Sequence, residues 1–224
     1  MINLLDRIWN LLDEGANAGR ERSPFTMLQA ATLGLDGAPQ VRTVVLRGVD
    51  RAARTLMFHT DARSAKAAEI ARDGRLALVG CDLANGLQIR AEGVASLRAS
   101  EAERLAIWRS SRPRTLILYR APLPPGTPVA EPTDAHPPAA PDGAEIDAME
   151  GFAQFAVIDV RIDAIDWLDL AADGHRRARF VYDAEGGQGA GGAGNAAGIG
   201  STQGVANTRS ADGAQGWRGG WVAP

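Results

Sequence analysis

Apolar and polar residues follow two different periods along this chain. Near the N-terminus, apolar residues recur every three or four positions, which is typical of one face of a helix. This set predicts a helix that ends near Gly15 and consists of Ile2, Leu5, Ile8, Trp9 and Leu12. Further along, apolar residues form short runs bounded by turn residues, which is typical of strands. The pattern therefore predicts an N-terminal helix followed by a sheet.

The expected strands are short and closely spaced. They cover residues 25–33, 41–46, 55–60, 75–81, 87–97, 155–162, 165–170, 177–182 and 217–222. Turn residues at 35–38 and 84–86 predict two hairpins. So many short strands with few helices indicate a mainly β fold, namely an antiparallel barrel with flanking helices.

Two further helices are expected at residues 64–72 and 100–110. Ser64 and Ser100 stand at the expected N-cap positions, because a serine hydroxyl accepts well from the free N–H groups of a first turn. Glu103 completes a capping-box pattern with Ser100. The second helix is expected to stop before Pro113, because proline interrupts helical hydrogen bonding.

Two segments differ in composition from the rest. Prolines are dense over residues 121–141, which predicts a loop or an extended crossing segment. Residues 185–216 are almost wholly Gly, Ala, Gln, Asn and Ser, and such a stretch buries too little apolar surface to offset its ordering entropy. We therefore expect one domain over residues 1–224 that carries a Pro-rich loop and a low-complexity, mobile insertion.

Charge and cysteine content exclude several classes of function. The 24 Lys and Arg residues face 27 Asp and Glu residues, so the net charge of −3 provides no field that would attract nucleic acid. Cys81 is the single cysteine, and the three histidines are scattered, so neither a disulfide nor a metal site is expected. With no signal peptide and no long apolar run, the sequence predicts a cytoplasmic protein without membrane contact.

Residues 42–66 bring together the groups that bind phosphate. Arg42 and Arg47 lie on one expected strand, and His59 and Thr60 end the next. Ser64 and Lys66, the only lysine of the chain, follow at the start of a helix. Cations and hydroxyls at a helix N-terminus are the donors that a phosphate needs. The sequence thus predicts a phosphate-binding site here.

Four motifs in this region carry a family resemblance. They are Arg-x-Val-Val-Leu-Arg at 42–47, Phe-His-Thr at 58–60, Ser-x-Lys-Ala at 64–67 and Leu-Gln-Ile-Arg-x-Glu-Gly at 87–93. In this order they resemble the pyridoxamine 5′-phosphate oxidase-like, FMN-binding split-barrel proteins. The resemblance implies an antiparallel split barrel, FMN as cofactor, a small-molecule substrate and flavin-dependent oxidoreductase activity. It also implies a homodimer with flavin sites at the subunit interface.

The resemblance assigns roles residue by residue. Arg42 and Lys66, assisted by Ser64, would contact the FMN phosphate. The segment Thr43, Val44, Val45 and Leu46 would lie along the flavin ring through its backbone and offer an apolar wall, with Arg47 near the ring. His59 and Thr60 match a Tyr-Thr pair of the family, and Gln88 matches its flavin-contacting glutamine. Trp167 would come from the second subunit, together with Arg177 or Arg179.

The positions that depart from the family pattern belong more to its substrate-binding residues than to its flavin-binding residues. Ala65 replaces a phosphate-binding arginine, a role that Arg63 could fill. The family's substrate-phosphate residues are matched only in part, by Trp108 and Arg112, and residues 115–119 read TLILY where a Gln-Ser pair is usual. These departures favour an oxidoreductase with a different substrate and identify no catalytic residue. A genuine pyridoxamine or pyridoxine 5′-phosphate oxidase and a non-catalytic flavin-binding or flavin-storage protein remain the alternatives.

Overall fold

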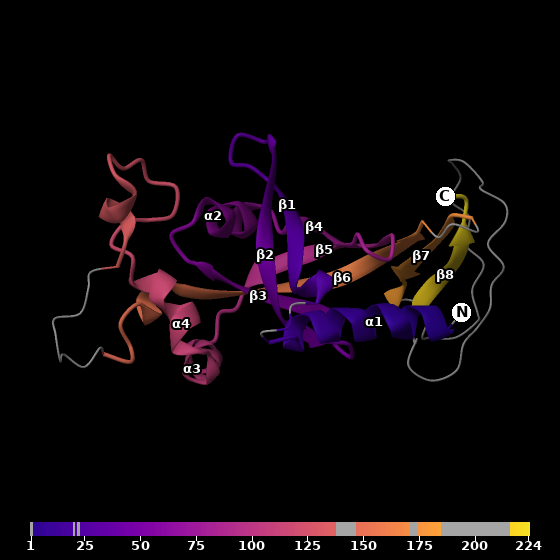
Figure 1. Cartoon of the computed structure of the whole chain (residues 1–224), viewed down its shortest axis with the longest axis horizontal. Coiled ribbons are helices and arrows are strands. Elements are labelled where there is room, and N and C mark those ends of the chain that lie inside the picture. The colour runs from indigo at the N-terminus through magenta and orange to yellow at the C-terminus, as the bar shows by residue number, and fades with distance from the viewer. Residues whose placement is uncertain (1, 20, 22, 138–146, 171–173, 185–215) are drawn as a thin grey trace, which may run out of the picture.

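A computed structural model describes residues 2–19, 21, 23–137, 147–170, 174–184 and 216–224 (Figure 1). Their strands form one antiparallel sheet in the order β3-β2-β1-β4-β5-β6-β7-β8, and β3 also pairs with β6. This extra pairing closes six strands into a barrel, which confirms the expected mainly β fold. The strands are β1 Met27–Leu33, β2 Pro39–Asp50, β3 Thr55–Asp61, β4 Arg75–Asp82, β5 Leu87–Leu97, β6 Phe155–Asp169, β7 Arg176–Tyr182 and β8 Trp217–Val222.

Helices flank the barrel on several sides. The described α-helices are α1 Ile2–Asn17, α2 Ala65–Arg72, α3 Glu101–Ser110 and α4 Pro113–Leu116. Short 3₁₀ helices are η1 Pro24–Thr26, η2 Ile117–Arg120, η3 Pro132–Ala135 and η4 Phe152–Gln154. In Figure 1, α3 and α4 gather at one end of the long strand β6, and β7 and β8 extend the sheet at the other end. No helix among the described residues is both long and apolar enough to cross a membrane.

The barrel core is built from alternate strand positions, because successive side chains of a strand point to opposite faces. Leu76 and Leu78 of β4 are buried in this way, whereas Ala77 between them is only partly buried. One face of α1 closes the core through Ile8 and Leu12, as the helical apolar pattern predicted. Burial of such side chains stabilises the fold by roughly 1.5–3 kcal/mol each.

A second, smaller core lies where β3 and β6 meet the helices α3 and α4. We call it the aromatic cluster; its buried members are Trp108, Tyr119, Phe155 and Val157. Tyr119 and Phe155 pack edge to face with ring centroids 5.1 Å apart, which is a favourable aromatic geometry. This cluster attaches the segment after α3 to the outside of the barrel.

Two expected strands prove to be one. Residues 155–162 and 165–170 were predicted as separate strands, but β6 runs through both. The register shifts opposite Glu92 and Gly93, so that Asp163 is accommodated in a bulge. Gly93 permits this close approach, since a Cβ there would lie 2.0 Å from the Arg161 carbonyl oxygen.

Other element boundaries shift by a few residues. Helix α1 continues past Gly15 to Asn17, and Phe25 lies in η1 rather than in β1. The hydroxyl of Ser100 accepts from the Glu103 N–H at 3.2 Å, as predicted for an N-cap. Of the Pro-rich loop, residues 121–137 are described and include η3, whereas residues 138–141 lie outside the described residues. The expected mobile insertion also lies outside them, apart from residue 216.

Candidate functional site

The barrel is split between β2 and β3. The two strands pair from Asp50–Thr55 to Leu46–Phe58, and the pairing does not continue to Val45 and His59. From there β2 pairs with β1, whereas β3 pairs with β6. Arg47 is the extra residue in the bulge between Leu46 and Gly48. One backbone edge of β2 is thus left open beside the end of β3, as a planar ligand held by backbone groups would require.

Helix α2 begins directly beyond this split. Ser64 stands at the N-cap position, as predicted, but its side chain does not cap the helix. The Ser64 hydroxyl instead contacts that of Thr60 at 3.1 Å, and both residues are buried. The first-turn N–H groups of α2 are therefore left without a side-chain partner from Ser64, and such groups attract anions.

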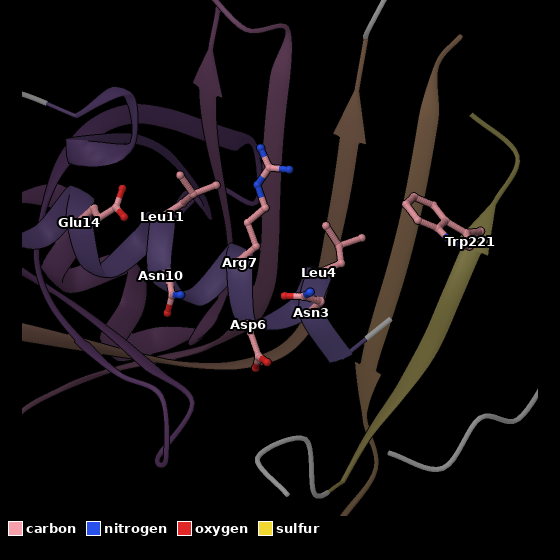
Figure 2. Close-up of a pocket in the computed structure, with 8 residues that line it drawn as sticks. All are labelled: Asn3, Leu4, Asp6, Arg7, Asn10, Leu11, Glu14 and Trp221. Atoms are coloured by element: carbon pink, nitrogen blue, oxygen red, sulfur yellow. The ribbon is translucent and has the colours of Figure 1, made fainter. Parts of the chain in front are cut away.

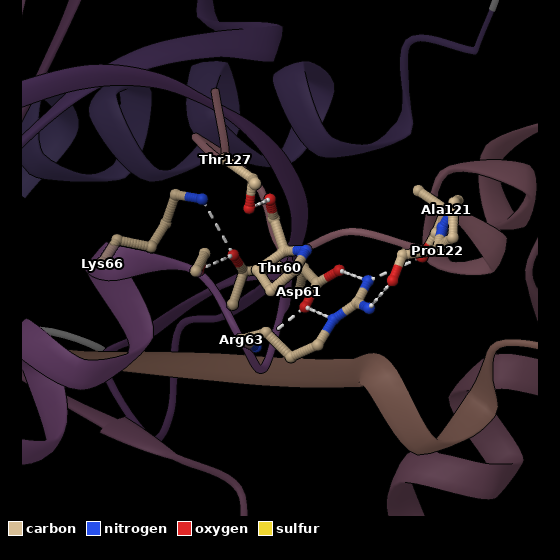
Figure 3. Close-up of polar contacts among 9 residues, drawn as sticks. Thr60, Asp61, Arg63, Lys66, Ala121, Pro122 and Thr127 are labelled. Atoms are coloured by element: carbon tan, nitrogen blue, oxygen red, sulfur yellow. Dashed lines mark hydrogen bonds and ion pairs between the residues drawn. The ribbon is translucent and has the colours of Figure 1, made fainter. Parts of the chain in front are cut away.

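Lys66 completes the arrangement in the first turn of α2. Its Nζ donates to Thr60 Oγ1 at 2.9 Å, so the ammonium lies over the hydroxyl pair (Figure 3). Burial and the nearby charge of Arg42 lower the pKa of Lys66 below its usual value. Both effects disfavour an isolated cation, so an anion placed here would be stabilised.

Arg42 is held by two residues that the sequence analysis missed. Its guanidinium pairs with Glu69 at 2.7 Å and also donates to the Thr32 hydroxyl. Thr32 in turn donates to Glu69 at 2.6 Å, and both of these residues are buried. A glutamate three residues after Lys66, in an otherwise apolar turn of helix, was the available signal. The network holds Arg42 close enough to lower the pKa of Lys66. Some of the guanidinium donors of Arg42 are already used by Thr32 and Glu69.

Arg63 does not replace the phosphate-binding arginine that Ala65 lacks. Its guanidinium pairs with Asp61 at 2.7 Å and donates to the carbonyl oxygens of Ala121 at 3.0 Å and Pro122 at 3.3 Å (Figure 3). The pairing with neighbouring Asp61 argues against the phosphate role expected for Arg63. Arg63 instead ties the loop before α2 to the Pro-rich segment.

The residues of β2 divide between the core and the outer face. Thr43 and Arg47 are exposed and Val45 is half-buried, whereas Val44 and Leu46 are buried in the barrel core. The expected apolar wall therefore reduces to Val45, because alternation along the strand turns the other two side chains inward. A backbone role for residues 43–46 stays a prediction.

His59 lies on β3 beside the split and beneath the aromatic cluster. Its ring packs edge to face on Phe155 with centroids 4.9 Å apart, and its buried Nε2 has no hydrogen-bond partner in the described part of the chain. Burial and the positive charges of Arg47 and Arg98 lower the pKa of His59 to about 4. The imidazole is thus neutral at pH 7.

The other predicted residues lie at the far end of the barrel. Thr60 pairs with Ala156 at the start of β6, whereas Gln88 pairs with Leu168 near its end. Twelve residues of strand separate these positions, or roughly 40 Å at about 3.3 Å per residue. Gln88, Trp167 and Arg177 form this distal group, and one chain cannot bring them to the split. Gln88 was expected to contact the flavin, and the structure places it beside Trp167, since Ile89 pairs with Trp167.

Two members of the distal group are engaged by other side chains. Trp167 is buried, with the Arg7 guanidinium 5.4 Å from its ring centroid. Arg177 pairs with Asp166 at 2.7 Å, and Arg90 pairs with the same buried carboxylate at 3.0 Å. Asp166 was missed by the sequence analysis because nothing in a strand pattern marks one acidic residue as buried.

The described residues also form an open groove of about 660 Å³ between α1 and β8 (Figure 2). Leu4, Leu11 and Trp221 provide its apolar surface, and Asp6, Arg7 and Glu14 are among its polar residues. None of the residues predicted to bind FMN lines this groove. The split between β2 and β3 is therefore the candidate site.

Comparison with known proteins agrees with this site. Residues 7–99 match the model of the family described as pyridoxamine 5′-phosphate oxidase, FMN-binding domain, and this segment contains β2, β3 and the start of α2. Residues 7–99 of this chain therefore resemble the FMN-binding domain of the pyridoxamine 5′-phosphate oxidase family. FMN is the cofactor of the domain that this family model describes.

Individual pyridoxine/pyridoxamine 5′-phosphate oxidases are only moderately similar to the chain. It is 29% identical over 187 residues to the pyridoxine/pyridoxamine 5′-phosphate oxidase of Xylella fastidiosa, covering 80% of this chain and 86% of that protein. It is 33% identical over 134 residues to the Thermobifida fusca protein of the same name, of which it covers 60%.

Solved structures share the fold along nearly the whole chain. A pyridoxamine 5′-phosphate oxidase-related, FMN-binding protein from Nostoc punctiforme has a TM-score of 0.70 at 21% identity, covering 98% of this chain and 96% of its own. PhzG from Burkholderia lata, in complex with tetrahydrophenazine-1-carboxylic acid, has a TM-score of 0.62 at 20% identity, with coverages of 100% and 92%. At these identities the likeness shows the split-barrel fold alone.

Proposed function

We propose that this protein is an FMN-dependent oxidoreductase of a small molecule and holds FMN in the split between β2 and β3. One observation carries the proposal: the open edge of β2 lies beside an α2 N-terminus whose Ser64 does not cap it, with Lys66 above. These groups suit FMN, because its phosphate is a dianion and its ring is flat and carries polar edges. We also propose that residues 1–224 form one domain.

Within this site the residues of this chain would bind FMN and orient it. Lys66, Arg42 and the first-turn N–H groups of α2 would hold the phosphate, with the Thr60–Ser64 hydroxyl pair beside it. The backbone of residues 43–46 would hydrogen-bond the ring edge, and Arg47 would offer positive charge near it. When bound, FMN supplies hydride and electron transfer, so the protein's contribution is positioning and electrostatics.

The separation of the predicted residues favours a homodimer. If Gln88, Trp167 and Arg177 contact FMN as the family resemblance implies, they must come from a second copy, since roughly 40 Å of strand separates them from the split. A twofold dimer would place each distal group at the partner's split and build two equivalent sites.

A genuine pyridoxamine or pyridoxine 5′-phosphate oxidase is the second candidate, favoured by the names of the curated relatives. Against it, Trp108, which matches a substrate-phosphate residue, is buried and donates its Nε1–H to the Ala148 carbonyl at 2.8 Å. Oxygen-dependent formation of pyridoxal 5′-phosphate from either vitamer would establish this narrower function. A bound flavin that no donor reduces would instead indicate flavin storage.

Titration with FMN tests the site. We expect one FMN per chain, and we expect Lys66→Ala to weaken binding about 10- to 100-fold, because a charge-assisted hydrogen bond contributes roughly 1.5–3 kcal/mol. Quenching of flavin fluorescence measures the affinity. Arg75→Ala is the matched control: it also removes one cation but from an exposed side chain that pairs with Asp73. Equal affinities for the two variants would reject the phosphate site.

Subunit complementation tests the shared site. Lys66→Ala and Arg177→Ala chains carrying different tags are co-expressed, and the mixed dimer is isolated by both tags. One of its two sites then carries both defects while the other carries neither, so we expect one tight FMN per dimer. Two weakened sites in the mixed dimer would show that both residues act within one chain.

A further inference from the structure

The turn between β3 and α2 holds Arg63 in one orientation. Asp61 is 8% exposed, and its carboxylate accepts from the Arg63 backbone N–H at 2.8 Å, from Nε at 3.0 Å and from Nη2 at 2.7 Å. The Ser64 N–H closes the same turn by donating to the Asp61 carbonyl oxygen at 3.0 Å. Because Ser64 is also the N-cap residue of α2, this turn and the helix start that would contact the FMN phosphate form one hydrogen-bonded unit.

The Arg63 guanidinium also holds a part of the chain that is distant in sequence. It donates to the carbonyl oxygens of Ala121 at 3.0 Å and Pro122 at 3.3 Å, where the Pro-rich segment leaves η2 (Figure 3). Residues 124–134 are all exposed, so packing in the barrel core does not fix their position. The placement of the Pro-rich segment therefore depends on its attachment at Ala121 and Pro122.

The chain that returns to β6 is attached to the same turn. The Ala62 N–H donates to the Gln154 carbonyl oxygen of η4 at 2.7 Å. Arg120 of η2 and Glu150 form an ion pair of 3.0 Å, which joins the outgoing and the returning chain. Both ends of the connection between η2 and η4 thus meet beside the start of α2, and the turn before α2 binds each of them.

We propose that Arg63 is a positioning residue that couples FMN binding to the placement of the Pro-rich segment. A phosphate bound at the first turn of α2 would fix the turn from Asp61 to Ser64, and Arg63 would transmit this constraint to residues 121 and 122. Coupling between two sites is reciprocal, so a segment held by Arg63 would in turn strengthen FMN binding. The inference rests on the proposed FMN site and goes beyond it, because Arg63 would act without contacting the phosphate.

Cleavage by trypsin tests the coupling in one direction. The bond between Arg120 and Ala121 lies at the attachment point, and a protease cuts such a bond only when the local structure opens. We expect FMN to slow this cut at least about 5-fold in the wild-type protein, the lower end of typical coupling between sites, and to leave it unchanged in Arg63→Ala. Mass spectrometry of the fragments measures the rate. Equal protection of both proteins by FMN, or protection of neither, would overturn the proposal.

Arg98→Ala is the matched control for this experiment. The Arg98 side chain is 26% exposed where that of Arg63 is 25%, and it likewise binds one carboxylate, that of Asp159, through two hydrogen bonds. Its carboxylate partners, Asp159 and Glu103, lie outside the Pro-rich segment. FMN is therefore expected to slow the cut in Arg98→Ala as it does in the wild-type protein. Loss of protection in this variant as well would refute a role specific to Arg63.

The affinity for FMN tests the coupling in the other direction. We expect Arg63→Ala to weaken FMN binding about 10-fold and Arg98→Ala to leave it unchanged. Arg63→Lys should weaken it as much as Arg63→Ala, because one ammonium keeps the charge but cannot reach the Asp61 carboxylate and two carbonyl oxygens at once. Full affinity in Arg63→Lys would indicate a direct effect of charge on the phosphate and would overturn the proposal. Failure of the wild-type protein to bind FMN would reject the proposed function itself.

Discussion

Replacing Asp166 by alanine is expected to lower the free energy of unfolding by about 1.5–3 kcal/mol, because it removes the buried acceptor of charge-assisted hydrogen bonds from arginines that are themselves about one-third exposed. The Asp166 side chain is 4% exposed and pairs with Arg90 at 3.0 Å and Arg177 at 2.7 Å, with Arg179 at 3.9 Å. Without the carboxylate, three guanidinium groups would face one another across neighbouring strands. Urea unfolding followed by tryptophan fluorescence measures the change.

The control for Asp166 is an acidic residue of the same cluster that is exposed. Glu92 pairs with Arg179 at 3.2 Å, and its side chain is 49% exposed, so Glu92→Ala is expected to cost at most about 1 kcal/mol. Similar losses in both variants would show that the burial of Asp166 does not strengthen its interactions.

The charge of Asp166 is expected to persist at neutral pH. Burial opposes its ionisation, but hydrogen bonding from Arg177 and the charge of Arg90 outweigh burial and lower the pKa below its usual value. The stabilisation is therefore present at neutral pH and is lost only as the pH falls through that lowered pKa.

A second large effect on folding stability is expected when the pH is lowered. Between pH 7 and pH 4, the wild-type protein should lose about 3 kcal/mol more stability than His59→Phe, because the folded protein holds the pKa of His59 at about 4. The unfolded chain takes up a proton near the ordinary value of 6.5, whereas the folded protein resists it. Stability due to the neutral histidine is thus complete above pH 6.5 and lost as the pH falls towards 4.

Unfolding free energies measured across this pH range, without FMN, provide the test. Phenylalanine preserves the ring contact with Phe155 and removes the titrating group. His136 is exposed, and His136→Phe should therefore lose as much stability on acidification as the wild-type protein does. Parallel pH curves for the wild-type protein and His59→Phe would contradict the argument. The groups responsible besides burial are Arg47 on β2 and Arg98 after β5.

Local patterns were enough to predict most of the secondary structure. The period-two runs marked nearly every strand, and the N-terminal apolar face marked α1, because each signal depends only on neighbours in the chain. The one false division, at Asp163, arose because a bulge opposite Glu92 and Gly93 accommodates a polar residue that would otherwise end a strand. Such compensation involves a strand some 70 residues away in the chain.

Part of the candidate site was predicted because its residues are also near neighbours in the chain. Arg42, His59, Thr60, Ser64 and Lys66 lie within 25 residues and were recognisable as a set of phosphate-binding types. Which of these side chains form ion pairs or hydrogen bonds within the protein was not predictable, since Glu69 and Thr32 meet Arg42 only in the folded barrel. Arg63 likewise looked available until the fold brought Ala121 and Pro122 to it.

The sequence by itself determined the mainly β barrel and the phosphate-binding residue types at the start of α2, because short-range periodicity and helix-start chemistry reside in contiguous residues. Only the tertiary structure decided which cations remain free and which predicted residues can share one site. Pairing of β6 with both β3 and β5 places Lys66 and Gln88 at opposite ends of the same long strand. Register between strands distant in sequence sets such distances, and no local pattern contains it.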